Sequence, residues 1–182
     1  MANVAKHKDA LIRTAMRLFR QQGYASTGLQ QILEESGAPK GSLYHYFPGG
    51  KEQLAEAAVR LAGRLVGEML AEHARRCRTP AAFVRAYCAT MAKWMKESDF
   101  RSGCPIATTM LETAPHSPEL TKAGAEAIDH WIGIIAPVFR ADGASAAQAR
   151  AKAERLVAAM EGALIVARIR RSAQPIVDIA AH

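Results

Sequence analysis

Residues 37–54 read GAPKGSLYHYFPGGKEQL and place Tyr44, His45 and Tyr46 side by side. On a helix with 100° per residue, Leu43 and Phe47 share one face, and His45 points almost directly away from Leu43. The segment stops at Pro-Gly-Gly, so this helix is only one or two turns long. We expect Leu43 and Phe47 to pack inward and the rings to form an outward plate with hydrogen-bonding tips.

Two helical patterns precede this segment. Residues 6–22 repeat apolar side chains at helical spacing, and Gly23 follows in the position of a left-handed cap. Thr27 is a good N-cap residue and Gln30 lies three positions later, which predicts a second helix that ends at Gly37. Two short helices joined by a glycine-containing turn are typical of a helix-turn-helix.

The remainder of the chain is also helical in pattern. We expect helices over residues 51–76, 80–96, 105–113, 118–139 and 146–171, with Thr79 capping the second of these. The predicted fold is all-α, with a three-helix helix-turn-helix DNA-binding domain over residues 1–50 and a larger helical effector-binding and dimerisation domain over residues 51–182.

The composition limits the class of protein. The chain has 182 residues, a formal net charge of +7 and three cysteines, Cys77, Cys88 and Cys104. The positive charge favours a polyanionic partner, although a solvated basic surface would give the same balance. An odd and low cysteine count argues against a disulfide framework. Neither a signal peptide nor a membrane-spanning run is visible, so we expect a cytoplasmic protein with no membrane partner.

The outward face of residues 39–47 suits the major groove of double-stranded DNA. Gly41 has no side chain and lets the backbone approach closely, and His45 can reach base edges. Hydroxyl and ammonium groups nearby can bond phosphates, and the start of the second helix at Thr27 can offer backbone N–H groups to another phosphate. The alternative is that the exposed rings form a protein–protein patch.

The segment from Leu11 to Leu54 resembles the N-terminal domain of the TetR family of bacterial transcription regulators. The resemblance rests on "A..LF...GY..T", "I....G....SLYHYF" and "KE.L", spaced over residues 10–60. It implies that DNA is lined by Thr27, Lys40, Gly41, Ser42, Tyr44, His45, Tyr46 and Lys51. Two features depart from the family: Pro39 stands where a capping Ser is usual, and the loop before Lys51 is one residue longer. In its length, this loop resembles that of the LmrA/YxaF-like branch of the family, which contains drug- and flavonoid-responsive repressors.

The C-terminal two thirds contain a candidate effector pocket. Polarisable or aromatic side chains at helical spacing suit a pocket for varied apolar ligands. The candidate effector-binding residues are Met91, Trp94, Met95, Cys104, Met110 and Trp131. The alternative is that these residues are ordinary core.

The last long helix carries an apolar stripe with small residues that would allow another helix to approach. We predict that it forms a homodimer interface, in a four-helix bundle with the segment DHWIGIIAPVF. The candidate interface residues are Leu156, Met160, Gly162, Ala163, Leu164 and Ala167. The alternative is that the stripe is core within one chain.

Enzyme chemistry has no support in the sequence. No HExxH, P-loop, GxGxxG or GxSxG motif occurs, so we predict no catalytic residue, no metal and no cofactor. The leading hypothesis is a homodimeric repressor that binds a palindromic operator and is released by a small apolar or aromatic effector. Two alternatives stay open: a thiol redox regulator using Cys104, and a small-molecule binding protein or enzyme with a vestigial DNA-binding module.

Overall fold

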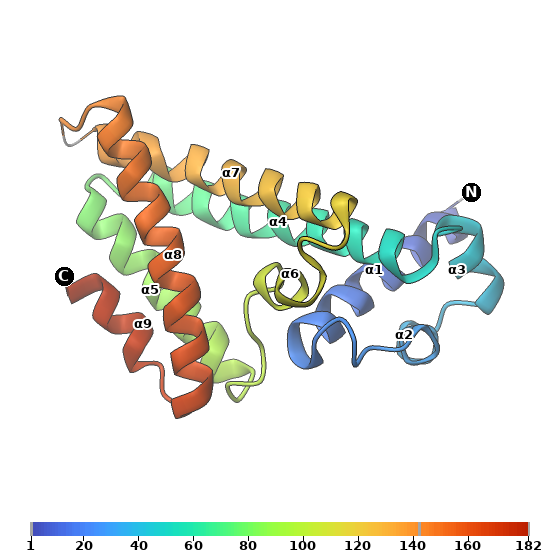
Figure 1. The fold of residues 1–182 in the computed structure, drawn as a ribbon. Coiled ribbons are helices and arrows are strands. Elements are labelled where there is room, and N and C mark those ends of the chain that lie inside the picture. The colour runs from blue at the N-terminus through green and yellow to red at the C-terminus, as the bar shows by residue number, and fades with distance from the viewer. Residues whose placement is uncertain (1, 142, 182) are drawn as a thin grey trace. The chain divides into compact units, whose positions relative to one another are not determined.

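The computed structural model describes residues 2–141 and 143–181, and this part of the chain is helical without a strand. In chain order the helices are α1 (Ala2–Gln22), α2 (Leu29–Ser36), α3 (Lys40–Tyr46), α4 (Gly50–Arg76), α5 (Pro80–Glu97), α6 (Ala107–Thr113), α7 (Pro118–Arg140), α8 (Ala146–Arg170) and α9 (Gln174–Asp178), followed by the 3-10 turn η1 (Ile179–Ala181) (Figure 1). The prediction of an all-α fold is confirmed.

Contacts divide the chain into two compact units. One contains the residues up to Gly63 together with Pro105–Ala127, and the other contains Arg64–Cys104 together with Ile128 onward. We call them the helix-turn-helix unit and the C-terminal unit. Helices α4 and α7 each contribute residues to both units, and α6 lies wholly in the helix-turn-helix unit. The predicted boundary at residue 50, between a DNA-binding and an effector-binding domain, stays a proposal.

The helix-turn-helix unit is built around the inner face of α1. Leu11, Ala15, Leu18 and Phe19 are buried there, and α1 contacts both α2 and α3. An ion pair of 2.5 Å between Arg17 and Glu35 joins α1 to α2 at the surface. Gly37 ends α2 in the left-handed conformation with φ 65°, as expected of a glycine that closes a helix. These contacts form the platform on which α3 lies.

Helices α4 and α7 run side by side through glycine contacts (Figure 1). In the helix-turn-helix unit, a Cβ at Gly63 would lie only 2.7 Å from the Cβ of Ala127. In the C-terminal unit, a Cβ at Gly67 would lie 2.7 Å from Nε2 of His130. Gly63 is therefore required by the close approach of the two helices, whereas a side chain at Gly67 would need the exposed His130 ring to move.

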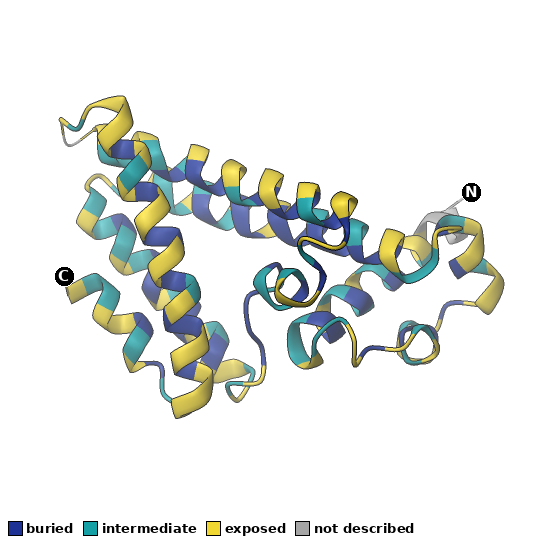
Figure 2. Ribbon diagram, viewed as in Figure 1, coloured by how far each residue is buried: buried dark blue, intermediate teal, exposed yellow. Residues whose placement is uncertain are grey.

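The core of the C-terminal unit lies between α5, α8 and α9 and the second halves of α4 and α7. Among its fully buried side chains are Phe83, Met95, Trp131, Met160 and Ile176. Figure 2 shows α8 with buried residues along one face and exposed residues along the other. Two caps fix helix starts: Thr79 Oγ1 accepts from Ala82 N at 3.2 Å, and Ser145 and Gln148 form a capping box. The predicted cap at Thr79 is confirmed.

Candidate nucleic-acid interface

Helix α3 presents the outward face that its spacing predicts. Leu43 is 0% exposed and Phe47 is 2% exposed, and both pack inward. Burying each of these side chains contributes roughly 1.5–3 kcal/mol, which fixes the rotation of the helix about its axis. His45, on the opposite side, is exposed. The predicted orientation of α3 is confirmed.

The outward face combines small, aromatic and charged groups. Lys40, Gly41 and Tyr44 are exposed, the last at 53%, while Ser42 and Tyr46 are partly exposed. The His45 and Tyr46 rings meet edge to face, with 4.9 Å between their centroids. The face therefore offers hydrogen-bonding groups of several kinds on one short helix, which suits contact with base edges and phosphates.

Gly41 is not required by packing within the chain. A Cβ added there would meet no other atom within 4 Å, and the residue is the second of the helix. In a helix, glycine is less favourable than alanine by up to about 1 kcal/mol, and contacts within the chain do not require it here. The missing side chain leaves room for a partner to approach this face closely.

The expectation that Thr27 caps α2 is wrong. Gly28, not Thr27, is the N-cap of α2, and no side chain caps that helix. Thr27 is 0% exposed, and its hydroxyl donates to the Gly23 carbonyl oxygen at 2.7 Å. The hydroxyl bonds back to the preceding turn instead of forward to the helix, so the Thr27 side chain cannot contact DNA in this conformation.

Lys51 is held against the helix-turn-helix rather than extended into solvent. Its Nζ lies 4.3 Å from the centroid of the Tyr24 ring and 3.4 Å from the carbonyl oxygen of Ala25. Burial lowers the pKa of Lys51, and the charge of Glu112 partly opposes this. A phosphate role for Lys51 stays a proposal, and it requires the side chain to leave these contacts.

The candidate effector residues do not all lie in one unit. Met91, Met95, Cys104 and Trp131 are buried in the C-terminal unit, where Trp94 is partly exposed. Met110 belongs to the helix-turn-helix unit and packs against Gly124. The structure therefore brings the other five candidates into one unit and leaves Met110 outside it.

A polar cluster beside these residues was missed by the sequence reasoning. The carboxyl of Glu161 on α8 accepts a hydrogen bond from the Cys104 thiol. The Glu161 charge also interacts electrostatically with the Tyr87 hydroxyl on α5. Burial raises the pKa of Glu161, and the hydrogen bond from Cys104 partly opposes this. Burial also raises the pKa of Tyr87. The available signal was that Glu161 is the one charged residue in the otherwise apolar run of residues 156–167.

The candidate dimer residues need a correction. Leu156, Met160, Ala163, Leu164 and Ala167 are buried within one chain, where α8 packs on α5 and α9. Each is at most 8% exposed in the single chain, which favours the core alternative for these five. Gly162 is exposed, and a Cβ there would meet nothing within 4 Å.

The outer face of α8 carries a second apolar stripe. Ile165 is 50% exposed, Val166 is 36% exposed and Ile169 is 76% exposed. Ala158 and Gly162 continue the stripe toward the start of the helix. We call Ala158, Gly162, Ile165, Val166 and Ile169 the outer stripe of α8. On α7, in the same unit, Gly133 is likewise exposed with open space around it.

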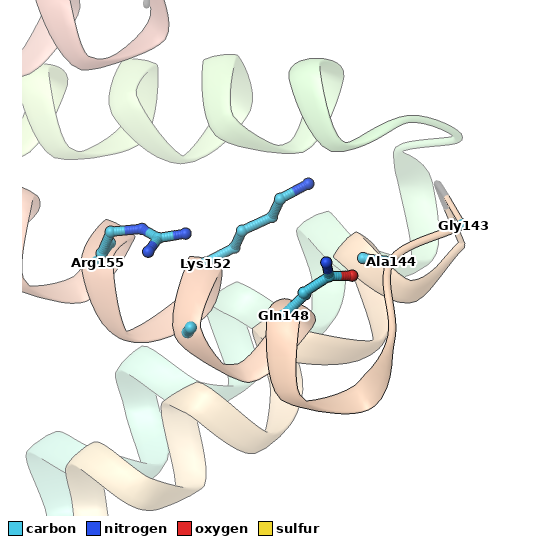
Figure 3. Close-up of a pocket in the computed structure, with 6 residues that line it drawn as sticks. Gly143, Ala144, Gln148, Lys152 and Arg155 are labelled. Atoms are coloured by element: carbon cyan, nitrogen blue, oxygen red, sulfur yellow. The ribbon is translucent and has the colours of Figure 1, made fainter.

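An open pocket of about 420 Å³ lies at the start of α8 (Figure 3). It is lined by Gly143, Ala144, Gln148, Ala151, Lys152 and Arg155, and none of the candidate effector residues takes part. Lys152 Nζ lies 5.9 Å from the centroid of the Phe139 ring. Within the described ranges, no cluster of His, Cys, Asp or Glu could hold a metal ion, and no helix is long and apolar enough to cross a bilayer.

Comparisons with known families match both parts of the chain. Residues 11–58 match the family described as bacterial regulatory proteins, tetR family. Residues 80–182 match the family described as transcriptional regulator LmrA/YxaF-like, C-terminal domain.

Individual proteins match over nearly the whole length. The HTH-type transcriptional regulator LmrA of Bacillus subtilis is 33% identical over 172 residues, covering 94% of this chain and 92% of the relative. YxaF of the same organism, an HTH-type transcriptional regulator, is 30% identical over 180 residues, covering 99% of this chain and 94% of the relative. A crystal structure of a TetR transcriptional regulator from Chloroflexus aurantiacus superposes with a TM-score of 0.85 at 27% identity, covering 100% of this chain and 94% of that one.

Proposed function

The chain belongs to the TetR family of bacterial transcriptional regulators, with an LmrA/YxaF-like C-terminal domain, and on this premise we propose that it is a ligand-responsive repressor that binds its operator as a homodimer. The observation that carries the proposal is the outward face of α3, which rests on buried Leu43 and Phe47 and exposes His45 and Gly41. We place this repressor in the cytoplasm, in contact with DNA.

The contacts with DNA fall into two kinds. His45 reads base edges, and Gly41 allows α3 to enter the major groove deeply enough for that contact. Lys40, Ser42, Tyr44 and Tyr46 bond phosphates and set the register of the helix on the duplex. Two copies of α3 about 34–36 Å apart would occupy successive major grooves of a near-palindromic site.

The outer stripe of α8 supports the homodimer. Its isoleucines are exposed in the single chain, and an exposed contiguous apolar patch is typical of an interaction surface. Gly162 on α8 and exposed Gly133 on α7 would let helices of a second copy approach closely. We propose that these two outer faces form a four-helix bundle with their counterparts in the partner.

The effector is proposed to bind in the C-terminal unit. Met91, Met95 and Trp131 supply apolar and polarisable surface, and Glu161 with Cys104 and Tyr87 supplies a polar group within it. The Glu161 carboxyl, which is partly buried and hydrogen-bonded to the Cys104 thiol, is a candidate ligand contact. The preferred effector is therefore a small apolar or aromatic molecule that carries a hydrogen-bond donor, and it must favour the state that does not bind DNA.

The alternatives have less support. A thiol sensor needs an accessible thiolate, whereas Cys104 is only 7% exposed. An enzyme with a vestigial DNA-binding module is disfavoured because the family consists of transcriptional regulators.

The proposed operator binding is tested by selecting duplexes from a random library with the wild-type chain. Fluorescence anisotropy should give at least about 10³-fold tighter binding to the selected duplex than to random duplex. Lys40→Ala should weaken binding to both duplexes and reduce the slope of log affinity against log salt by about 1. Lys96→Ala, in the C-terminal unit, is the control. Equal affinity of the wild type for both duplexes would contradict the proposal.

A thermal-shift screen of apolar and aromatic compounds tests the effector site. A true effector raises the apparent Tm of the wild type and dissociates the selected duplex. Its affinity should fall about tenfold in Glu161→Gln, because a charge-assisted hydrogen bond is lost. Unchanged affinity in that variant would remove Glu161 from the site while leaving the repressor proposal intact.

A further inference from the structure

A carboxylate from α6 holds the turn between α1 and α2. Glu112 Oε1 accepts from the backbone N–H of Tyr24 at 3.0 Å, and its Oε2 accepts from that of Ala25 at 2.6 Å. The partners are separated by 88 and 87 residues in sequence but lie in the same compact unit. In Figure 1, α6 lies beside the end of α1, and the two helices are in contact.

The turn is shaped to receive this carboxylate. Gly23 has φ 87°, and a Cβ there would collide with Glu112 Oε1. The first glycine after α1 therefore ends the helix and also leaves space for the acid. Lys51 Nζ lies over the Tyr24 ring and close to the carbonyl oxygen of Ala25. The same two residues are thus held by an acid from α6 and a base from α4.

Satisfying two backbone donors does not by itself explain Glu112. Ala25 is exposed and Tyr24 is partly exposed, so water could bond both N–H groups. The acid instead ties the turn to one particular helix, and α2 begins four residues after Ala25. A bidentate, charge-assisted contact restricts direction as well as distance. Its consequence is to fix the approach of α2, and with it the position of α3.

We propose that Glu112 is a positioning residue for DNA binding: through the Tyr24 and Ala25 amides it ties the helix-turn-helix to α6, so that α6 sets the operator affinity. This inference depends on the proposed operator binding. The chain also connects the proposed effector site to α6 directly, because Cys104, which donates to Glu161, precedes α6 by only Pro105 and Ile106.

The sign of one substitution separates positioning from charge. Removing a negative charge from a DNA-binding unit should tighten binding to a polyanion if only electrostatics matter. Loss of a positioning contact should weaken it. Glu119→Ala is the matched control. Glu119 is exposed in the same unit and makes no hydrogen bond or ion pair with the described residues, so its substitution removes the same charge without removing a contact.

The experiment uses the full-length chain labelled with 15N and the duplex that the wild type selects. In Glu112→Ala, the Tyr24 and Ala25 amide proton resonances should move upfield and exchange about tenfold faster with solvent. Affinity for the selected duplex should fall about 5- to 20-fold with an unchanged salt slope, since no phosphate contact is removed. Glu112→Gln, which keeps an acceptor oxygen, should lie between Glu112→Ala and the wild type. Glu119→Ala should change neither readout in this direction.

Three results would overturn the inference. Wild-type amide shifts in Glu112→Ala would show that the contact does not form in solution. Altered amide shifts with unchanged or tighter DNA binding would make Glu112 a local surface contact without a positioning role. A wild-type chain that selects no duplex would contradict the proposed function and this role together, and the amide readout would then still report whether the contact exists.

Discussion

Gly41 and Leu43 sit two positions apart on α3 and face different surroundings. Leu43 is fully buried against the rest of the unit, whereas Gly41 faces open space. Where packing within the chain does not constrain a residue, its identity can instead suit a binding partner that contacts this surface. This contrast at the level of single side chains separates the part of α3 that holds the fold from the part that we propose meets DNA.

Gly41→Ala should therefore leave the free chain as stable or more stable. Alanine favours a helix over glycine by up to about 1 kcal/mol, and the added methyl group meets no atom of the chain. Binding to the selected duplex should fall at least about tenfold, because the methyl group stands between α3 and the groove. Urea denaturation and anisotropy titration measure the two effects. A loss of stability, or unchanged DNA affinity, would contradict the proposed close approach.

Glu161→Gln should remove a pH dependence of stability. Burial raises the pKa of Glu161 in the folded chain above the ordinary value of 4.5. The folded chain then holds its proton to higher pH than the unfolded chain, so this residue's contribution is fully present below pH 4.5 and is lost as pH rises through the folded pKa. The free energy of unfolding of Glu161→Gln minus that of the wild type should become more positive over this rise.

Denaturant titrations at a series of pH values give that difference directly. Glu119→Gln serves as the control for loss of an exposed carboxylate. A constant difference for Glu161→Gln across the same range would mean that its carboxyl is solvated in the folded chain.

Helix α8 shows how far an element can be derived from sequence. It has apolar side chains on two faces, Leu156, Met160 and Leu164 inside and Ile165 and Ile169 outside. Helical periodicity predicts each stripe but does not state which one meets the chain's own α5 and α9. The sequence reasoning chose as interface the stripe that is buried within the chain, and the outer stripe is the one that we propose instead. On α3 the same reasoning succeeded, because the helix has a single apolar pair and its other faces are polar.

Local capping chemistry succeeded at two helices and failed at a third. Thr27 has the side chain of an N-cap and a glutamine three residues later, yet its hydroxyl bonds back to Gly23 and Gly28 takes the cap position. Thr79 and Ser145 follow the same rule and do cap their helices. The Glu112 contact could not be predicted at all, because it joins segments 87 residues apart through backbone groups that leave no sequence signal.

Ile169→Glu tests the outer stripe of α8. The side chain is 76% exposed in the single chain, so the substitution should leave folding intact. In a dimer it would bury an unpaired charge, and the wild-type dimer should become a monomer in sedimentation velocity. Leu111→Glu on α6, also 76% exposed, should leave the dimer unchanged. A wild type that sediments as a monomer, or a dimeric Ile169→Glu, would contradict this interface.

For the whole molecule, charge and recognition make separable contributions to DNA binding. The net charge of +7 attracts any DNA duplex, and this attraction weakens as the salt concentration rises. Sequence preference must come instead from the few side chains that reach base edges. A regulator requires both contributions, and only the second distinguishes it from a basic protein that binds nucleic acid without preference.

The central claim is that the outward face of α3 reads DNA sequence, and His45→Ala tests it most directly. His116→Ala is the control, because His116 is exposed between α6 and α7. The measurement is the ratio of affinities for selected and random duplex at fixed salt. We expect His45→Ala to lower this ratio by about 5- to 150-fold, equivalent to about 1–3 kcal/mol, with little change for random duplex. An unchanged ratio in His45→Ala would contradict the account.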